Sequence, residues 1–183
     1  RLGTDPLSAL SLSFPLQMII IAIAVGTGVG TSSLISRRLG QGEREEAANA
    51  AEHVILISLF YSIIMALIGY FLSDRLFVIF TNDANLINLG TQYISIILMG
   101  SIALFFPMIS NNILRGEGNT FIPMVVMVIG AVINIILDPF LIYGLWIFPR
   151  LGIQGAAIAT VTARLLSGIF LLFMLKKKKN ELK

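Results

Sequence analysis

The sequence predicts an all-α, polytopic membrane protein with five transmembrane helices. Hydrophobic residues make up 56% of the 183 residues and charged residues only 13%, about half the share found in soluble domains. Five long stretches contain almost no charged residues, and each is long enough to form a bilayer-spanning helix, which needs about 20 apolar residues. Because hydrocarbon offers the backbone no hydrogen-bond partners, we expect these stretches to be helical.

The first predicted span covers residues 7–36, which contain no charged side chain. Pro6 is expected at the first helical position, after Thr4 or Asp5 as the N-cap. Pro15 lies inside this helix and is expected to kink it, because proline removes a backbone donor and crowds the preceding turn.

The second predicted span covers residues 47–73 and follows a turn at 37–42. Its helix begins with three acidic residues, a position where negative charge suits the helix dipole; they are Glu43, Glu45 and Glu46. A short amphipathic stretch, residues 74–80, follows the span and is expected to lie before the next one.

The other three predicted spans cover residues 84–114, 120–144 and 153–175. The polar residues 81–83 are expected to cap the third span, which contains Pro107. We find no soluble domain and no complete internal repeat. An odd number of helices starting from outside leads us to expect further chain before the first residue.

Lysine and arginine are distributed unequally between alternating loops, which predicts the orientation. Three lie on one side, Arg1, Arg75 and Arg150, and nine on the other, Arg37, Arg38, Arg44, Arg115, Lys176, Lys177, Lys178, Lys179 and Lys183. The positive-inside rule places the nine in the cytoplasm. We expect a multi-pass protein of the cell (plasma) membrane whose end, Lys176–Lys183, is cytoplasmic.

The sequence lacks the residues that several kinds of metal site and enzyme active site require. There is no cysteine for a thiolate metal site, and no nucleophilic triad or metal-binding histidine pair that an enzyme would need. The net charge of +3 does not suggest a nucleic-acid partner, and the lysines at 176–179 suit anionic lipid headgroups. The glycine-rich run 26–31 follows no strand, so we interpret it as small residues for helix packing, and we expect no organic cofactor.

Asp138 is the most informative residue, because a carboxylate inside a span is costly and usually serves ions or protons. Asn134 lies four residues earlier on the same helical face. Pro139 frees the carbonyl of Ile135 and disfavours helical geometry at Asp138. These oxygens favour a site for Na+ or H+. The alternative is a buried aspartate bonded within the bundle or paired with Arg164.

The fifth span offers partners to this site. Thr160 is expected at the same depth as Asp138, about 12 Å from the interface by helical rise, and Ala156 can offer its carbonyl one turn nearer the outside. A Na+ site at Asp138, Asn134 and Thr160 is therefore predicted. The alternative for Thr160 is a hydroxyl bonded to its own helix.

Four further polar residues of the spans are candidates for lining a cavity. Arg164 is on the face of Thr160, one turn deeper, where three roles are open: a counter-charge to Asp138, a cavity-lining group, or a side chain reaching the interface. Three amides are candidates for a substrate path or for bonds between helices: Gln17, Asn111 and Asn112.

Four segments together resemble the multidrug and toxic compound extrusion (MATE) transporters. They are Ser36–Gly42 followed by Ala47, Leu114–Thr120 followed by Pro123, Asn134–Pro139, and Leu151–Thr160. Their order and their placement between helices carry the resemblance, which covers nearly the whole chain.

The resemblance implies a twelve-helix exporter of two six-helix lobes that exchanges organic, often cationic, compounds for Na+ or H+ by alternating access. This chain would supply helices two to six of the amino-terminal lobe. The matching cation-site positions are Asn134, Asp138, Thr160 and the Ala156 carbonyl. The partners implied are small organic substrates, the lipid bilayer, and the first helix and second lobe of the same transporter.

Two other functions remain open at this stage. A flippase or exporter of lipid-linked or polysaccharide precursors would be expected to have a more cationic cavity, whereas the spans here contain only Arg164, which favours organic cations. A membrane-embedded enzyme would need a nucleophile or metal constellation that the sequence does not contain. A passive structural module would have little reason to keep Asp138 beside Pro139 in a span, and a packing role is the alternative for this pair.

Overall fold

The computed structural model describes residues 4–146 and 148–181, and these residues form seven helices. Their bounds are α1 (Asp5–Gly40), α2 (Arg44–Phe71), α3 (Ser73–Val78), α4 (Ala84–Met99), α5 (Ile102–Gly116), α6 (Phe121–Tyr143) and α7 (Ile153–Glu181). Within this part of the chain no strand is present. By length and composition, four helices could cross a membrane, and the bent pair of α4 and α5 would make a fifth span if it crosses as one. The predicted all-α fold is therefore confirmed, with four or five candidate spans.

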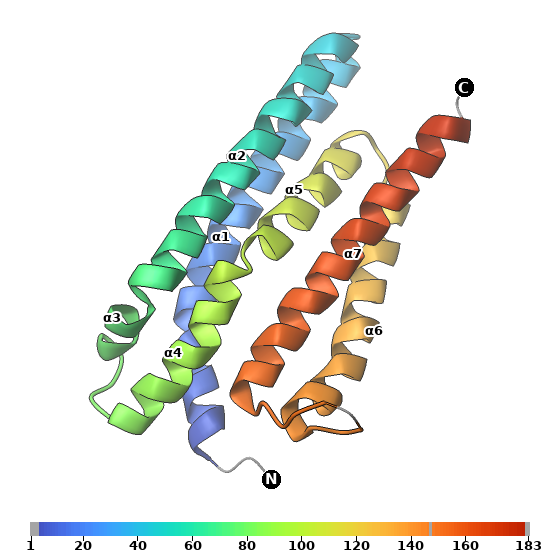
Figure 1. The fold of residues 1–183 in the computed structure, drawn as a ribbon. Helices are drawn as coiled ribbons and strands as arrows, with labels where there is room; N and C mark the ends of the chain where they lie inside the picture. The colour runs from blue at the N-terminus through green and yellow to red at the C-terminus, as the bar shows by residue number, and fades with distance from the viewer. Residues whose placement is uncertain (1–3, 147, 182–183) are drawn as a thin grey trace.

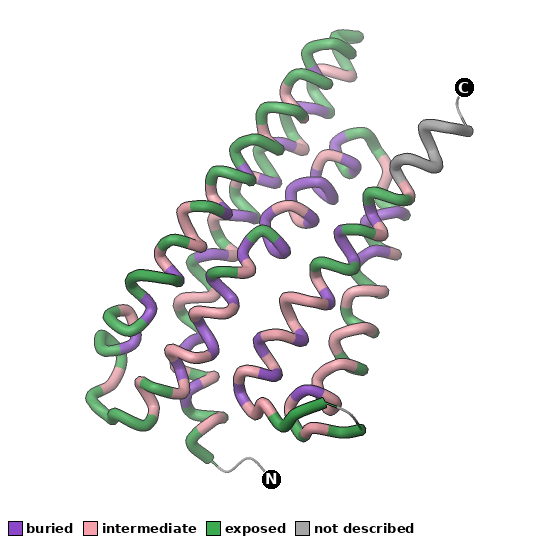
Figure 2. The backbone as a smooth tube through the Cα atoms, in the orientation of Figure 1, coloured by how far each residue is buried: buried purple, intermediate pink, exposed green. Residues whose placement is uncertain are grey.

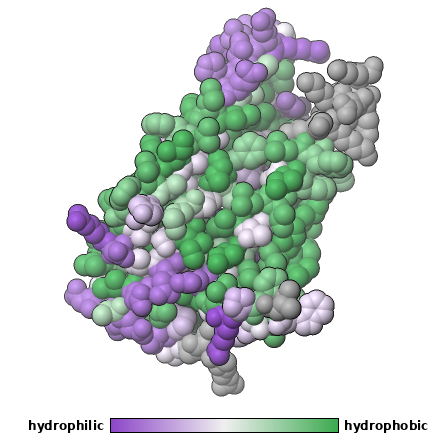
Figure 3. Space-filling model, in the orientation of Figure 1, coloured by the Kyte–Doolittle hydropathy of each residue, from purple (hydrophilic) through white to green (hydrophobic). Residues whose placement is uncertain are grey.

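The helices form one bundle in which α1 packs against α2, α4 and α5, while α6 and α7 pair with each other (Figure 1). The turn after α1, the turn after α5 and the end of α7 lie at one end of the bundle. The α3 end and the α6–α7 loop lie at the other. Side chains are green and apolar across the middle of the molecule and purple toward both ends (Figure 3). This banding suits a bilayer.

The buried residues lie toward the centre of the bundle, and the outer faces of the long helices are exposed (Figure 2). The main core lies where α4 and α5 meet α1 and where α3 packs against α4, around Phe77, Ile94 and Phe105. Large apolar side chains such as Ile135, 70% exposed on α6, point out of the bundle. Such exposure is expected where lipid, and not water, surrounds the protein.

The helix ends agree closely with the predicted caps. Thr4 is the N-cap of α1, although its side chain makes no capping hydrogen bond. Asp83 caps α4, because its Oδ1 accepts hydrogen bonds from the backbone N–H groups of Asn85 at 2.8 Å and Leu86 at 3.3 Å. The amphipathic stretch before it forms α3. Helix α1 continues as one helix through Pro15.

The third span differs from its prediction as one helix over 84–114, because it is broken at Gly100 and Ser101 with a bend of 47°. Pro107 cannot donate to the carbonyl of Ala103, which weakens the start of α5. Tighter i to i−3 bonds replace the helical ladder there, such as Leu104 N–H to Ser101 O at 2.9 Å. The Ser101 hydroxyl donates to the Ser62 carbonyl of α2 at 2.9 Å and anchors the bend.

Glycines bring neighbouring helices together at defined points. A Cβ on Gly28 would lie 2.4 Å from Nδ2 of Asn112, so α1 and α5 approach closely there. Gly26 and Gly30 face open space instead. The packing role expected for the run 26–31 therefore applies to its central glycine.

Candidate functional site

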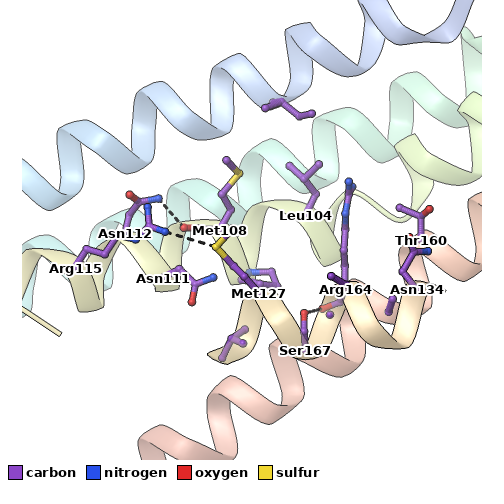
Figure 4. A pocket seen from close by; sticks show the side chains of 16 residues that line it. Leu104, Met108, Asn111, Asn112, Arg115, Met127, Asn134, Thr160, Arg164 and Ser167 are labelled. Carbon is purple, nitrogen blue, oxygen red and sulfur yellow. Dashed lines mark hydrogen bonds between the residues drawn. The ribbon is translucent and has the colours of Figure 1, made fainter. Parts of the chain in front are cut away.

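A cavity of 420 Å³ lies between α5, α6 and α7, with Ile21 of α1 at its wall (Figure 4). Each of the three helices presents one face to it. Pockets that bind small organic molecules have volumes of about 300–1,000 Å³ and apolar walls with a few polar groups. This cavity fits that description.

The wall from α5 is the most amphipathic. Leu104, Met108, Asn111, Asn112 and Arg115 recur three or four residues apart and border the cavity. The Nδ2 of Asn112 donates to the carbonyl of Met108 at 2.8 Å. Oδ1 of Asn111 is buried and accepts no hydrogen bond from the described residues. The cavity is therefore polar at this side.

The wall from α6 carries the predicted carboxylate at its end. Met127, Ala131 and Asn134 border the cavity, and Asp138 continues the same face one turn further. Asn134 Nδ2 donates to Asp138 Oδ1 at 3.3 Å. Both side chains are half-buried. Asp138 itself is not a lining residue, but its bonding partner is.

The wall from α7 brings Thr160, Ala163, Arg164 and Ser167 to the cavity on one helical face. The Thr160 hydroxyl donates to the carbonyl of Ala156 at 2.9 Å. That bond within its own helix is the alternative that the sequence left open, and it also places the Thr160 and Ala156 oxygens next to each other.

Close contacts between α6 and α7 set their register. A Cβ on Gly155 would lie 2.4 Å from the Leu141 carbonyl oxygen, and one on Gly130 would lie 3.3 Å from the Ser167 side chain. In this antiparallel register Thr160 lies at a level between Asn134 and Asp138. The structure therefore brings α6 and α7 together where the sequence predicts the cation site.

Three of the four candidate cavity residues border this space, namely Asn111, Asn112 and Arg164. Gln17 does not, and its Nε2 lies 3.5 Å from the hydroxyl of Ser13 in its own helix. Among the described residues Arg164 forms no ion pair with Asp138, and the ion pair present joins Arg38 to Glu43 at the α1–α2 turn.

Sequence reasoning missed most of the cavity lining, including Met108, Met127 and Arg115. The sequence predicts Arg115 in a loop, but it lies in the last turn of α5 and continues the face of Asn111. Its guanidinium Nη2 lies 3.6 Å from the sulfur of Met127. The helical spacing from Leu104 to Arg115 was the available signal.

Comparison with known proteins finds relatives that are membrane transporters. The MatE family matches residues 1–140. The FAD transporter of Shewanella oneidensis is 36% identical over 161 residues, which cover 88% of this chain and 36% of that protein. The probable multidrug resistance protein YoeA of Bacillus subtilis is 30% identical, covering 99% of this chain and 39% of that protein. This chain thus spans well under half the length of these relatives.

The fold also has a close counterpart among solved structures. A MOP superfamily transporter from Pyrococcus furiosus superposes with a TM-score of 0.88 and 37% sequence identity. The match covers 95% of this chain and 38% of that one. The arrangement of the helices in this part of the molecule is therefore shared with a known transporter.

Proposed function

The chain belongs to the MatE family of multidrug and toxic compound extrusion transporters, and from this premise we propose that it is part of a secondary active exporter. The exporter moves small organic compounds out of the cell in exchange for Na+ or H+. It is a transporter and not an enzyme, and it requires no organic cofactor. The observation that carries the proposal is the pairing of Asn134 with Asp138 beside a cavity of drug size.

The coupling site we propose is formed by oxygens from α6 and α7. Asp138 supplies a carboxylate, Asn134 an amide oxygen, Thr160 a hydroxyl, and Ala156 its carbonyl. Hard oxygen ligands of this kind suit a small cation, and the carboxylate alone suits a proton. The register of α6 and α7 supports the shared site, because Thr160 lies at the level of the α6 pair.

Coupling follows if the cation and the organic compound favour different conformations of the helices around the cavity. The bend between α4 and α5 lies near the cavity, and Pro107 of α5 is one of its lining residues. Gly168 of α7 packs against the Pro107 ring, where a Cβ would be 2.9 Å from Cγ. We propose that α5 moves relative to α7 at this contact during the cycle.

The family leaves the cargo open, because the relatives include both multidrug resistance proteins and one FAD transporter. The cell membrane and a cytoplasmic Lys176–Lys183 end are proposed from the loop charges. Arg1 and Lys183, used in that count, lie outside the described residues.

The test is ion-driven transport by the full-length protein in proteoliposomes, with fluorescent substrates of both charges. In the wild type, an imposed Na+ or proton gradient is expected to drive transport of ethidium, of fluorescein, or of both. Asp138→Asn should abolish the gradient-driven part. Asp74→Asn, a matched change at an exposed carboxylate of α3, should leave it intact. Transport that Asp138→Asn leaves unchanged removes Asp138 from the mechanism.

A further inference from the structure

Both charged side chains that border the cavity are arginines. Among the described residues its lining contains Arg115 and Arg164 and no aspartate or glutamate. The sequence placed a single arginine in the spans, but the fold brings the end of α5 to the same space and adds a second. The cavity is therefore more cationic than the composition of the spans suggests.

Within the described residues, Arg164 is a half-buried charge that no other side chain pairs with. Its guanidinium forms no hydrogen bond or ion pair within the described residues. Asp138 accepts from Asn134 and lies outside the lining. Tyr93 lies near the Arg164 guanidinium, but its hydroxyl carries no counter-charge. A charge placed inside an apolar span is costly unless a counter-charge meets it.

The two arginines lie at opposite ends of the cavity with apolar surface between them (Figure 4). Arg115 is at the end of Asn112, and Arg164 is at the end of Asn134 and Thr160. Leu104, Met108 and Met127 fill the middle. Thioether side chains adapt to flat or irregular apolar groups.

Asn111 adds a second, independent sign of a missing ligand. Its side chain is only 8% exposed and borders the cavity. Its Oδ1 has no donor among the described residues. A buried acceptor without a donor loses its hydration without replacement, so a ligand that donates a hydrogen bond would satisfy it.

We propose that this cavity binds organic anions: Arg164 pairs with a phosphate or carboxylate, an aromatic or aliphatic body lies along Leu104, Met108 and Met127, and a ligand donor bonds Asn111. The inference rests on the proposed function, because it names the substrate class of the same cavity. Guanidinium groups form short, charge-assisted hydrogen bonds with both kinds of anion. Organic cations would meet two positive charges here and are expected to bind weakly.

Equilibrium binding to the full-length protein tests this class without requiring transport. Flavin mononucleotide and riboflavin differ only in a phosphate, and fluorescein and rhodamine 123 share a ring system but carry opposite charges. Fluorescence titration is expected to show that the anion binds more tightly than its partner in at least one pair. Flavin mononucleotide is the anion compared with riboflavin, and fluorescein is the anion compared with rhodamine 123. Discrimination within the flavin pair identifies the phosphate as the group recognised, and discrimination within the dye pair alone identifies a preference for anions that carry no phosphate.

The variants assign the effect to Arg164. Arg164→Gln should weaken binding of the preferred anion about 10- to 100-fold, as expected for one charge-assisted contact. It should leave binding of uncharged riboflavin unchanged and should not weaken binding of cationic rhodamine 123, because it removes a positive charge. Arg164→Lys should retain most of the affinity, and Arg75→Gln, an exposed arginine of α3 outside the cavity, should retain all of it.

Equal binding within both probe pairs by the wild type overturns the inference, as does an anion affinity that Arg164→Gln leaves intact. The wild-type comparison decides even if Arg164→Gln fails to fold. Ion-driven export of ethidium without anion preference would contradict the substrate class and leave the proposed function standing. A third outcome would contradict the proposed function alone. In it, Arg164→Gln loses anion binding, but no ion gradient drives transport by the wild-type protein.

Discussion

Thr160 shows how one side chain joins two parts of the proposed site. Its hydroxyl donates to Ala156 within α7 at 2.9 Å, so the hydroxyl oxygen keeps its lone pairs for another partner. That oxygen lies at the level of Asn134 and Asp138 because of the α6–α7 register. The bond to Ala156 thus orients the hydroxyl and does not compete with a cation.

The residue-scale prediction concerns this hydroxyl. Thr160→Val keeps the volume of the side chain and removes the oxygen, so cation affinity should fall about tenfold, the effect of one neutral ligand contributing about 1.4 kcal/mol. Titration of the full-length protein with Na+ or H+ measures it. Thr162→Val, on α7 but away from the cavity, is the control. Equal affinities in the two variants would exclude the hydroxyl as a ligand.

The sequence could predict the α6 half of the site because Asn134 and Asp138 are four residues apart on one helix. The hydrogen bond between them follows from that spacing alone. It could not place Arg115 in the cavity, because that depends on where α5 ends and how far it bends toward α6. Gln17, a candidate on polarity alone, is not among the residues that line the cavity.

At the scale of elements, α6 and α7 depend on glycine for their close pairing. Gly155 lies against the backbone carbonyl of Leu141, and the loop between the helices is tied by Leu151 N–H to the same carbonyl at 3.1 Å. Gly144 ends α6 in the left-handed conformation, with φ of 70°. Together these contacts hold the register on which the proposed cation site depends.

Gly155→Ala should destabilise the protein, because its Cβ would lie 2.4 Å from a carbonyl oxygen that cannot move independently. A cost of about 1–3 kcal/mol is expected for such overpacking. Gly30→Ala is the matched control, since nothing lies within 4 Å and alanine favours a helix by about 0.5–1 kcal/mol. Thermal unfolding of both full-length variants in detergent tests this. A Gly155→Ala protein as stable as Gly30→Ala would show that the helices can separate freely.

The bounds of the helices were predictable to within a few residues, because apolar length and charged turns mark them independently. The cap at Asp83 is one such mark, and its two backbone donors confirm it. The break in the third span was not predicted. Its position depends on Ser101 meeting the Ser62 carbonyl and on Gly100 meeting Val161, where a Cβ would be 2.6 Å away. Such tertiary contacts are not visible in local sequence.

At the scale of the whole molecule, most positive charges near the described turns lie at one end of the bundle, and Arg75 and Arg150 lie at the other. The turns after α1 and α5 lie at the first of these ends together with the end of α7 (Figure 1). The orientation itself stays a prediction from the positive-inside rule. It also determines from which side the cavity and the proposed cation site are filled.

Single cysteines can test the orientation, because this chain contains none. Gln41→Cys in the α1–α2 turn should react with a membrane-impermeant maleimide only from the cytoplasmic side. Asn82→Cys, before α4, should react only from outside. Both positions are exposed, and other cysteines of the full-length protein would first be replaced by serine. Labelling of both sites from the same side would refute the five-span topology, and the reverse pattern would invert the orientation.

The central claim is that Asp138 binds the ion that drives the exporter. Equilibrium binding of ²²Na+, together with proton release followed by a pH indicator, measures this directly in the purified full-length protein. We predict that the wild type and Asp74→Asn bind the ion equally and that Asp138→Asn loses one Na+ or one titrating proton per protein. Undiminished ion binding by Asp138→Asn would contradict the account.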